Sequence, residues 1–238
     1  MKLPNVGWSA QRHSHSKELS RRTFCFSMLL LGVSGCSNNS SLIKVAGDAL
    51  NVAIRGFPGT PLDRDQIEAL PYASLAAKLG KGPRSLLVLG KVAKQELHWY
   101  SADHIVMVTY RGRLMKTAGL PKNLSQTLLY KDDPFKSPRK PTPGTSAVTR
   151  VINLSPDEIY QDPVVSTWQG GESETIEIVN RRYETVRWEE VCRCKISGWK
   201  FTNTFWFDPE HALVWRSEQH IHHELPPITI EMLKQNQT

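Results

Sequence analysis

Alternation between apolar and polar positions is clearest from residue 186 to residue 196. The odd positions there are mostly charged and the even positions mostly apolar; the even side chains are Val186, Trp188, Glu190, Cys192, Cys194 and Ile196. Successive side chains of a strand point to opposite faces, so this pattern predicts a β-strand with one buried face. The aromatic-rich run at residues 199–207 alternates in the same way and predicts a partner strand.

Two turns would join these strands and the next one in an antiparallel meander. Ser197-Gly198 fits a two-residue hairpin turn, and residues 208–212 fit a five-residue loop. With these turns the buried faces of three strands coincide, and the paired residues are Ile196–Trp199, Cys194–Phe201, Trp188–Phe207, Phe207–Leu213 and Phe205–Trp215. A slip of one residue would move every side chain to the other face, so this agreement favours the register.

Helical periodicity is confined to the first part of the chain. Apolar residues recur at helical spacing over residues 41–55, which predicts an amphipathic helix, and a further helical turn is expected at Asp65–Ala69. From Tyr72 onward the chain consists of short β-like runs separated by Gly, Pro, Asn and Asp. The Pro-rich, locally basic run Tyr130–Ser146 is interpreted as a solvated loop. The predicted fold class is mainly β, a single antiparallel domain with one N-terminal amphipathic helix.

The longest apolar run lies near the N-terminus, from Phe24 to Val33. Its ten residues are too few for a membrane-spanning helix, which needs about 20, and suit the apolar core of a signal peptide. Arg21 and Arg22 supply the positive charge before this core and form the candidate export signal. Residues 20–24 resemble a twin-arginine signal, so both that route and the general secretion route stay open.

The end of this segment resembles the lipobox of bacterial lipoproteins. Val33-Ser34-Gly35-Cys36 places small residues before a cysteine, and in that family the cysteine carries a diacylglyceryl group and an acyl chain such as palmitate. Three acyl chains exceed the two signals that stable anchoring needs. Ser37 is not the aspartate that retains lipoproteins in the inner membrane, so the resemblance implies the periplasmic face of the outer membrane. The chain is therefore divided into a signal peptide (1–35), a tether (36–41) and a single mainly-β domain (42–238).

Loss of the signal peptide would change the charge balance. The full chain of 238 residues has a formal net charge of +7. The 203 residues from Cys36 onward carry 25 basic and 22 acidic side chains, which gives a net charge of +3. Proteins that bind nucleic acid concentrate basic residues on one face, and this near balance predicts no nucleic-acid partner.

Cysteine and histidine pairs near the C-terminus have a composition that would suit zinc. They are Cys192-x-Cys194 and His220-x-His222-His223. In the predicted register both thiols lie on the inner face, whereas His220 and His222 lie on the outer face as surface residues. The expectation is therefore two buried free thiols, no metal site and no cofactor. A strained local disulfide and a metal site are the alternatives.

Catalytic motifs are missing from the sequence. It has no Gly-x-Ser-x-Gly elbow, no phosphate-binding loop and no dinucleotide fingerprint. Adjacent carboxylates such as Asp132-Asp133 and Glu189-Glu190 would point to opposite faces of a strand, so their spacing does not make them acid/base pairs. The sequence therefore predicts no catalytic residue and favours a protein that is not an enzyme.

The stretch His98–Asn123 is the best candidate for a binding surface. It combines a strand with adjacent aromatic residues, a break near Asp103, a buried strand and an Arg-Gly turn. Because neighbours in a strand point to opposite faces, at most one of Trp99 and Tyr100 is expected in the core. An exposed ring beside a carboxylate and a guanidinium suits a sugar or a protein partner. The candidate surface consists of Trp99, Tyr100, Asp103, Arg111 and Arg113.

Together with "LPYASL" (Leu70–Leu75) and "TNTFWFDPEHALVWRS" (residues 202–217), this stretch resembles the exopolysaccharide lipoprotein family of the YjbF and GfcB type. The resemblance covers most of the mature chain. It implies an antiparallel β-barrel or curved half-barrel and a non-enzymatic accessory role in capsule or exopolysaccharide assembly or export. Its partners would be the outer membrane, through the lipid anchor, and polysaccharide or polysaccharide-secretion proteins.

Two other functions remain as alternatives. A periplasmic glycan-modifying enzyme would need two carboxylates about 5–10 Å apart in a groove. A carrier of an acyl chain would need an empty, apolar barrel interior.

Overall fold

Alternating side chains form strands through most of the chain that the structure describes. The computed structural model describes residues 63–136, 141–156, 159–211 and 213–235. All of them belong to one compact unit. The predicted signal peptide, the lipidation site at Cys36 and the predicted amphipathic helix lie outside the described residues.

The described residues contain one α-helix, one 3-10 turn and twelve strands. In chain order these elements are α2 (Arg64–Ala69), β1 (Ser74–Leu79), β2 (Arg84–Ala93), β3 (Glu96–Ser101), β4 (Val106–Tyr110), β5 (Arg113–Ala118), β6 (Asn123–Leu129), η1 (Pro134–Lys136), β7 (Ser146–Ser155), β8 (Ile159–Ile178), β9 (Arg181–Cys194), β10 (Lys200–Phe207), β11 (Val214–Gln219) and β12 (Ile228–Lys234).

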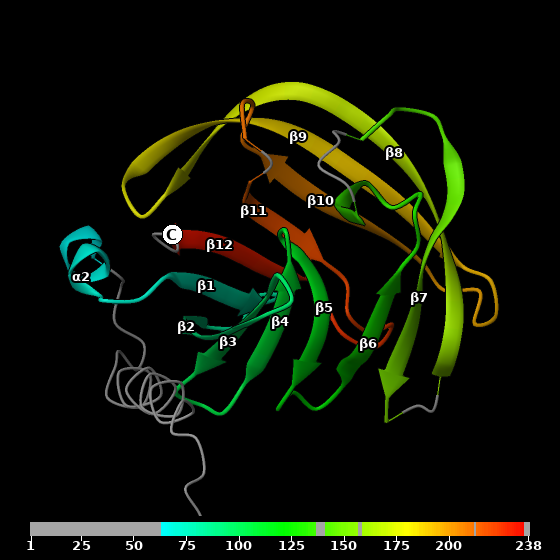
Figure 1. Cartoon of the computed structure of the whole chain (residues 1–238), viewed down its shortest axis with the longest axis horizontal. Coiled ribbons are helices and arrows are strands. Elements are labelled where there is room, and N and C mark those ends of the chain that lie inside the picture. The colour runs from blue at the N-terminus through cyan, green and yellow to red at the C-terminus, as the bar shows by residue number, and fades with distance from the viewer. Residues whose placement is uncertain (1–62, 137–140, 157–158, 212, 236–238) are drawn as a thin grey trace, which may run out of the picture. The chain divides into compact units, whose positions relative to one another are not determined.

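The strands form one sheet in the order β5-β4-β3-β2-β1-β12-β11-β10-β9-β8-β7-β6. Every hydrogen-bonded pair in this order is antiparallel, including the pair of the first and last strands, β1 and β12. β5 and β6, the two ends of the order, lie side by side, and the Thr117 hydroxyl accepts a hydrogen bond from the Leu124 amide there (3.0 Å). The sheet therefore curves into a nearly closed barrel (Figure 1), which confirms the predicted mainly-β fold class.

Two apolar clusters fill the inside of the barrel. One is built mainly from aliphatic side chains and includes Leu75, Trp99, Cys192 and Ile228. The other is mainly aromatic, and its buried members are Val108, Met115, Leu129, Phe135, Trp168, Trp188, Phe205 and Val214. The even positions of β9 from Val186 to Cys194 point inward as their alternation predicts.

A third cluster covers part of the outer face. Ala76 of β1 and Trp206 of β10 lie between inward-pointing neighbours, so both point outward. They belong to one cluster with Ile67 of α2 and Ile178 at the tip of the β8–β9 hairpin. Arg64 of α2 donates a hydrogen bond to the carbonyl of Ile178 (2.7 Å). α2 confirms the helical turn expected in this segment, and its function in the fold is to cover the sheet.

The β9–β10 hairpin has the predicted faces but a different register. Phe201 pairs with Cys192, not with Cys194 as predicted, because the turn is wider than two residues. The buried carboxylate of Asp162 accepts hydrogen bonds from the amides of Ile196 (2.8 Å) and of the residue after it (2.9 Å). The shift is two residues, so the inward face is kept, but Ile196 is 71% exposed and not part of that face.

The next hairpin contradicts the predicted position of Trp215. Phe205 pairs with Ser217, and Trp215 is the extra residue of a β-bulge opposite the end of β10. Trp215 therefore lies on the outer face, where its ring is 4.1 Å from that of Tyr183. The sequence pattern failed here because a one-residue bulge changes which side chains share a face.

The connection between β6 and β7 is only in part the solvated loop that its composition predicts, because Asp133, Phe135 and Pro141 are buried while most of its other described residues are exposed. We call its described parts, residues 130–136 and 141–145, the plug loop. η1 inserts the ring of Phe135 between those of Trp168 (6.1 Å between centroids) and Phe205 (5.0 Å). Figure 1 shows this segment turning inward, within the curve of the sheet. The plug loop thus contributes to the barrel core.

Candidate functional site

Glu190 lies inside the barrel on the inward face of β9 and is fully buried. Its carboxylate accepts five hydrogen bonds, which come from Arg113 Nη1 (3.0 Å), Arg113 Nη2 (2.9 Å), Arg150 Nη1 (2.5 Å), Ser166 Oγ (2.9 Å) and Asn203 Nδ2 (2.9 Å). The donors belong to β5, β7, β8 and β10. A carboxylate offers about four lone-pair sites, so Glu190 is saturated and joins strands from both halves of the sheet.

A second carboxylate, from the plug loop, completes this arrangement. Asp133 is buried, and its Oδ2 lies 3.3 Å from Arg113 Nη2 and 4.0 Å from Arg150 Nη1. The guanidinium of Arg113 also lies over the ring of Phe135, 4.3 Å from its centroid. We call Arg113, Arg150, Asp133 and Glu190 the charge cluster. Two cations and two carboxylates make it formally neutral, which a buried group of charges requires.

The electrostatic environments of the two carboxylates differ. Burial alone would raise the pKa of Glu190, but Arg113 and Arg150 outweigh burial and hold that pKa well below its ordinary value. Burial raises the pKa of Asp133 above its ordinary value, and the nearby Arg113 only partly opposes this effect. Glu190 is therefore the permanent anion of the cluster, and Asp133 is the carboxyl that takes up a proton more readily.

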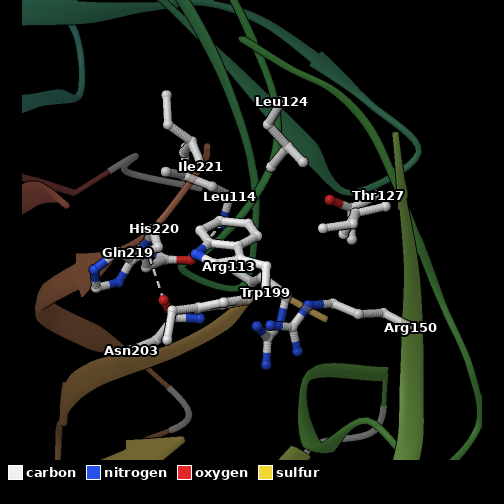
Figure 2. Close-up of a pocket in the computed structure, with 12 residues that line it drawn as sticks. Arg113, Leu114, Leu124, Thr127, Arg150, Trp199, Asn203, Gln219, His220 and Ile221 are labelled. Atoms are coloured by element: carbon white, nitrogen blue, oxygen red, sulfur yellow. Dashed lines mark hydrogen bonds between the residues drawn. The ribbon is translucent and has the colours of Figure 1, made fainter. Parts of the chain in front are cut away.

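The charge cluster lies between two cavities. The smaller one, of about 20 Å³, is lined by both arginines together with Trp199 and His220. Figure 2 shows the side chains of Arg113 and Arg150 converging beneath the Trp199 ring. In the same view, the His220 backbone amide donates a hydrogen bond to Oδ1 of Asn203 (2.8 Å). A cavity of this size holds about one water molecule, so it is not a site for an organic ligand.

The larger cavity has a volume of about 530 Å³ and lies between the plug loop and the inner face of β7 and β8. We call it the plug-loop cavity. The residues that define its chemistry are Lys131, Asp132, Asp133, Thr149, Ser166 and Trp168. Its volume is within the range of about 300–1,000 Å³ typical of small-molecule sites. Asp133 connects the cavity to the charge cluster.

The structure separates the five residues of the predicted binding surface. Trp99 is in the core, 1% exposed, and its Nε1 donates a hydrogen bond to Thr109 (2.8 Å). Tyr100 is partly exposed, which confirms that at most one of the adjacent rings is buried. Arg113 is buried in the charge cluster and is not a surface residue.

The other two predicted residues lie far from each other. Asp103 is exposed in the turn between β3 and β4, and Arg111 is in the turn between β4 and β5. These turns are at opposite ends of β4. The prediction that these positions contribute to one binding surface is therefore wrong, because Arg113 is buried and the two turns that carry Asp103 and Arg111 lie at opposite ends of a strand.

The cysteines behave as predicted and two of the histidines do not. Cys192 and Cys194 are free and buried, and burial raises the pKa of their thiols to about 12 and about 11. His220 lines the smaller cavity and His222 is fully buried. Both were expected at the surface, but the chain turns inward after β11 and places Ile221 in the core. Among the residues that the structure describes, no group of three or more His, Cys, Asp or Glu side chains could hold a metal ion.

Sequence reasoning missed the charge cluster as a unit. Its members are brought together from positions that are 40 and 77 residues apart along the chain. One local signal was present: Glu190 occupies an inward position of an alternating strand, and a carboxylate there needs cationic partners. Which arginines supply them could not be read from spacing.

The family model described as "Group 4 capsule polysaccharide lipoprotein gfcB, YjbF" matches residues 47–233. The "Uncharacterized lipoprotein GfcB" of Escherichia coli (strain K12) is 28% identical over 214 residues, which are 90% of this chain and 98% of that protein. The "Uncharacterized lipoprotein YjbF" of the same organism is 25% identical over 195 residues, 82% of this chain and 91% of that protein.

The barrel also resembles a solved structure. The crystal structure of the hypothetical lipoprotein YmcC from Escherichia coli (K12) has a TM-score of 0.69 and 26% sequence identity, and the likeness covers 85% of this chain and 100% of that one. No helix among the described residues has the length and hydropathy needed to cross a membrane. Because the family model spans well over half of the sequence, the chain belongs to the group 4 capsule polysaccharide lipoprotein family of GfcB and YjbF.

Proposed function

We propose that this protein is an outer-membrane lipoprotein that faces the periplasm and acts as a non-enzymatic accessory in the assembly or export of capsule or exopolysaccharide. One observation carries the proposal: the capsule lipoprotein family model matches residues 47–233, which include eleven of the twelve described strands in full and β12 up to Leu233. The match therefore concerns the whole barrel and not a short motif.

Cys36 is the proposed anchor, and Arg21 and Arg22 are the proposed export signal. The ten-residue apolar core and the small residues before Cys36 support a signal peptide that ends at a lipidated cysteine. A barrel anchored in this way to the periplasmic face of the outer membrane would lie close to polysaccharide that is being exported across that membrane.

The state of the two buried carboxylates favours binding over catalysis. Glu190 and Asp133 contact the same nitrogen of Arg113, which places them within the separation of about 10 Å that glycoside hydrolysis allows. Both are fully buried, however, and Glu190 has no lone pair left for a substrate or a water molecule. A role as acid, base or nucleophile would first require the charge cluster to break.

The barrel interior also disfavours a carrier of acyl chains. The two inner clusters and the charge cluster occupy the space that an acyl chain would need. A carrier of this type needs an apolar lumen, whereas the plug-loop cavity is bounded mainly by polar side chains.

A strain that lacks the gene tests the proposal. We expect such a strain to lose most of its cell-surface capsule or exopolysaccharide, measured as uronic acid and total hexose in the extracted surface fraction. The intact chain should restore the polysaccharide, whereas Cys36→Ala should leave the protein outside the outer-membrane fraction and should not restore it. Wild-type amounts of surface polysaccharide in the deletion strain would contradict the proposed role.

A further inference from the structure

The plug-loop cavity has a buried polar floor and an exposed polar rim. Thr149, Ser166 and Trp168 belong to the floor, and each is at most 3% exposed. Asp132 and Thr145 belong to the rim, and both are exposed. The walls are also connected, because the Gly144 amide of the plug loop donates a hydrogen bond to the Trp168 carbonyl (3.0 Å). The cavity is therefore built from two fixed elements.

Two buried polar atoms at this cavity have no hydrogen-bond partner among the described residues. They are the indole Nε1 of Trp168, a donor, and Oδ2 of Asp133, an acceptor. The Asp133 oxygen does have an ion-pair contact with Arg113 (3.3 Å), so the Trp168 indole is the group left without a polar contact among the described residues. Leaving a buried donor such as this indole N–H unpaired is unfavourable, so native structures keep few such groups, and each one calls for an explanation. A ligand that offers both donors and acceptors would satisfy the two atoms, and a hydroxyl group offers both.

The charges around the cavity select among polar ligands. Among the described residues that line the cavity, Lys131 is the one cation, against the carboxylates of Asp132 and Asp133. The two arginines of the charge cluster are already paired with Glu190. An anionic ligand such as a phosphate or a uronate would therefore meet net negative charge or none, whereas an uncharged ligand would not be repelled.

We propose that the plug-loop cavity is a binding site for one or two residues of an uncharged saccharide. Sugar hydroxyls bond to the carboxylates and to the threonine hydroxyls of the rim, and the ring lies against the Trp168 side of the floor. The choice of a saccharide rests on the proposed function in capsule or exopolysaccharide handling. Asp132 is the rim carboxylate that fixes the orientation of the sugar.

Nuclear magnetic resonance of the indole groups tests this site. The full chain, in detergent micelles and labelled with 15N-tryptophan, is titrated separately with D-glucose, D-galactose, N-acetyl-D-glucosamine, lactose and cellobiose, and with sodium D-glucuronate as the charged comparison. We expect at least one uncharged sugar to shift the Trp168 resonance saturably in the millimolar range. Trp168→Phe identifies that resonance by its loss, and Trp188→Phe is the matched control, because Trp188 lies in the same aromatic cluster outside the cavity.

The contribution of Asp132 is measured in the same titration. A hydrogen bond to a charged group contributes about 1.5–3 kcal/mol, so Asp132→Asn should weaken binding about tenfold or more, and Asp103→Asn, an exposed carboxylate elsewhere, should not. Failure of every uncharged sugar to shift Trp168, or a saturable shift with glucuronate alone, would overturn the inference. The titration and the deletion strain test different proposals. If the deletion strain loses its polysaccharide but no sugar binds in the titration, the saccharide site is contradicted and the proposed function is not.

Discussion

Replacing Glu190 by glutamine is expected to lower the free energy of unfolding by about 3–5 kcal/mol, because it removes the carboxylate to which both buried guanidinium groups are hydrogen-bonded. The carboxylate accepts hydrogen bonds from Arg113, Arg150, Ser166 and Asn203. A neutral amide would place an NH₂ group against some of these donors. Urea denaturation followed by circular dichroism measures the effect.

Glu189→Gln is the matched control for this change. Glu189 is the next residue on the same strand but points to the other face, where it is partly exposed and pairs with Arg187. Exposed ion pairs contribute about 0.2–1 kcal/mol, so this variant should unfold within about 1 kcal/mol of the wild type. Equal losses for the two variants would contradict a structural role for the charge cluster.

The free energy of unfolding should also depend on pH through the ionisation of Glu190. The pKa of Glu190 is lower in the folded state than in the unfolded chain. Its contribution to stability is therefore fully present above the unfolded-state pKa of about 4.3 and is lost as the pH falls towards the folded-state pKa. Between these limits the wild type should lose stability on acidification more steeply than Glu190→Gln does.

Replacing Phe135 by alanine is expected to release the plug loop. The ring is buried, packs against three aromatic side chains and lies beneath the guanidinium of Arg113. Truncating such a ring costs about 3–5 kcal/mol in a rigid core. Here part of the loss should appear as local opening, because the loop can leave the barrel without unfolding the strands.

Limited proteolysis with trypsin measures this opening. Cleavage after Lys131 and Lys136 should become at least tenfold faster in Phe135→Ala, while the strands remain intact. Tyr130→Ala is the control, because Tyr130 lies in the same loop with 40% of its surface exposed. Unchanged cleavage in the Phe135 variant would mean that the plug loop is held by other contacts.

The strands could be predicted well from the sequence, because a strand with one buried face shows a two-residue alternation of apolar and polar side chains. Trp188, Cys192 and Phe205 all point inward as the alternation requires. The pattern could not reveal the wider turn held by Asp162 or the bulge at Trp215, since both depend on contacts from another strand. Registers were therefore wrong by two residues although most of the predicted faces were right.

The site was less predictable than the fold for a related reason. Tyr130–Ser146 has the composition of an exposed loop, yet Asp133 and Phe135 lie within the barrel because Arg113 and the aromatic cluster accept them there. Arg113 was selected from the sequence as a surface residue. Its position at the start of β5 gave no sign that its partner, Glu190, is 77 residues away.

We propose that the barrel acts in capsule or exopolysaccharide handling through the plug-loop cavity. The most direct measurement complements the deletion strain with the double variant Asp132→Asn/Trp168→Phe and, as its matched control, Asp103→Asn/Trp188→Phe, and records surface polysaccharide and the amount of protein separately. We expect the cavity variant to accumulate to normal levels but to restore little polysaccharide, whereas the control should restore it. Full restoration by the cavity variant, or a loss that only follows the amount of protein, would contradict the claim.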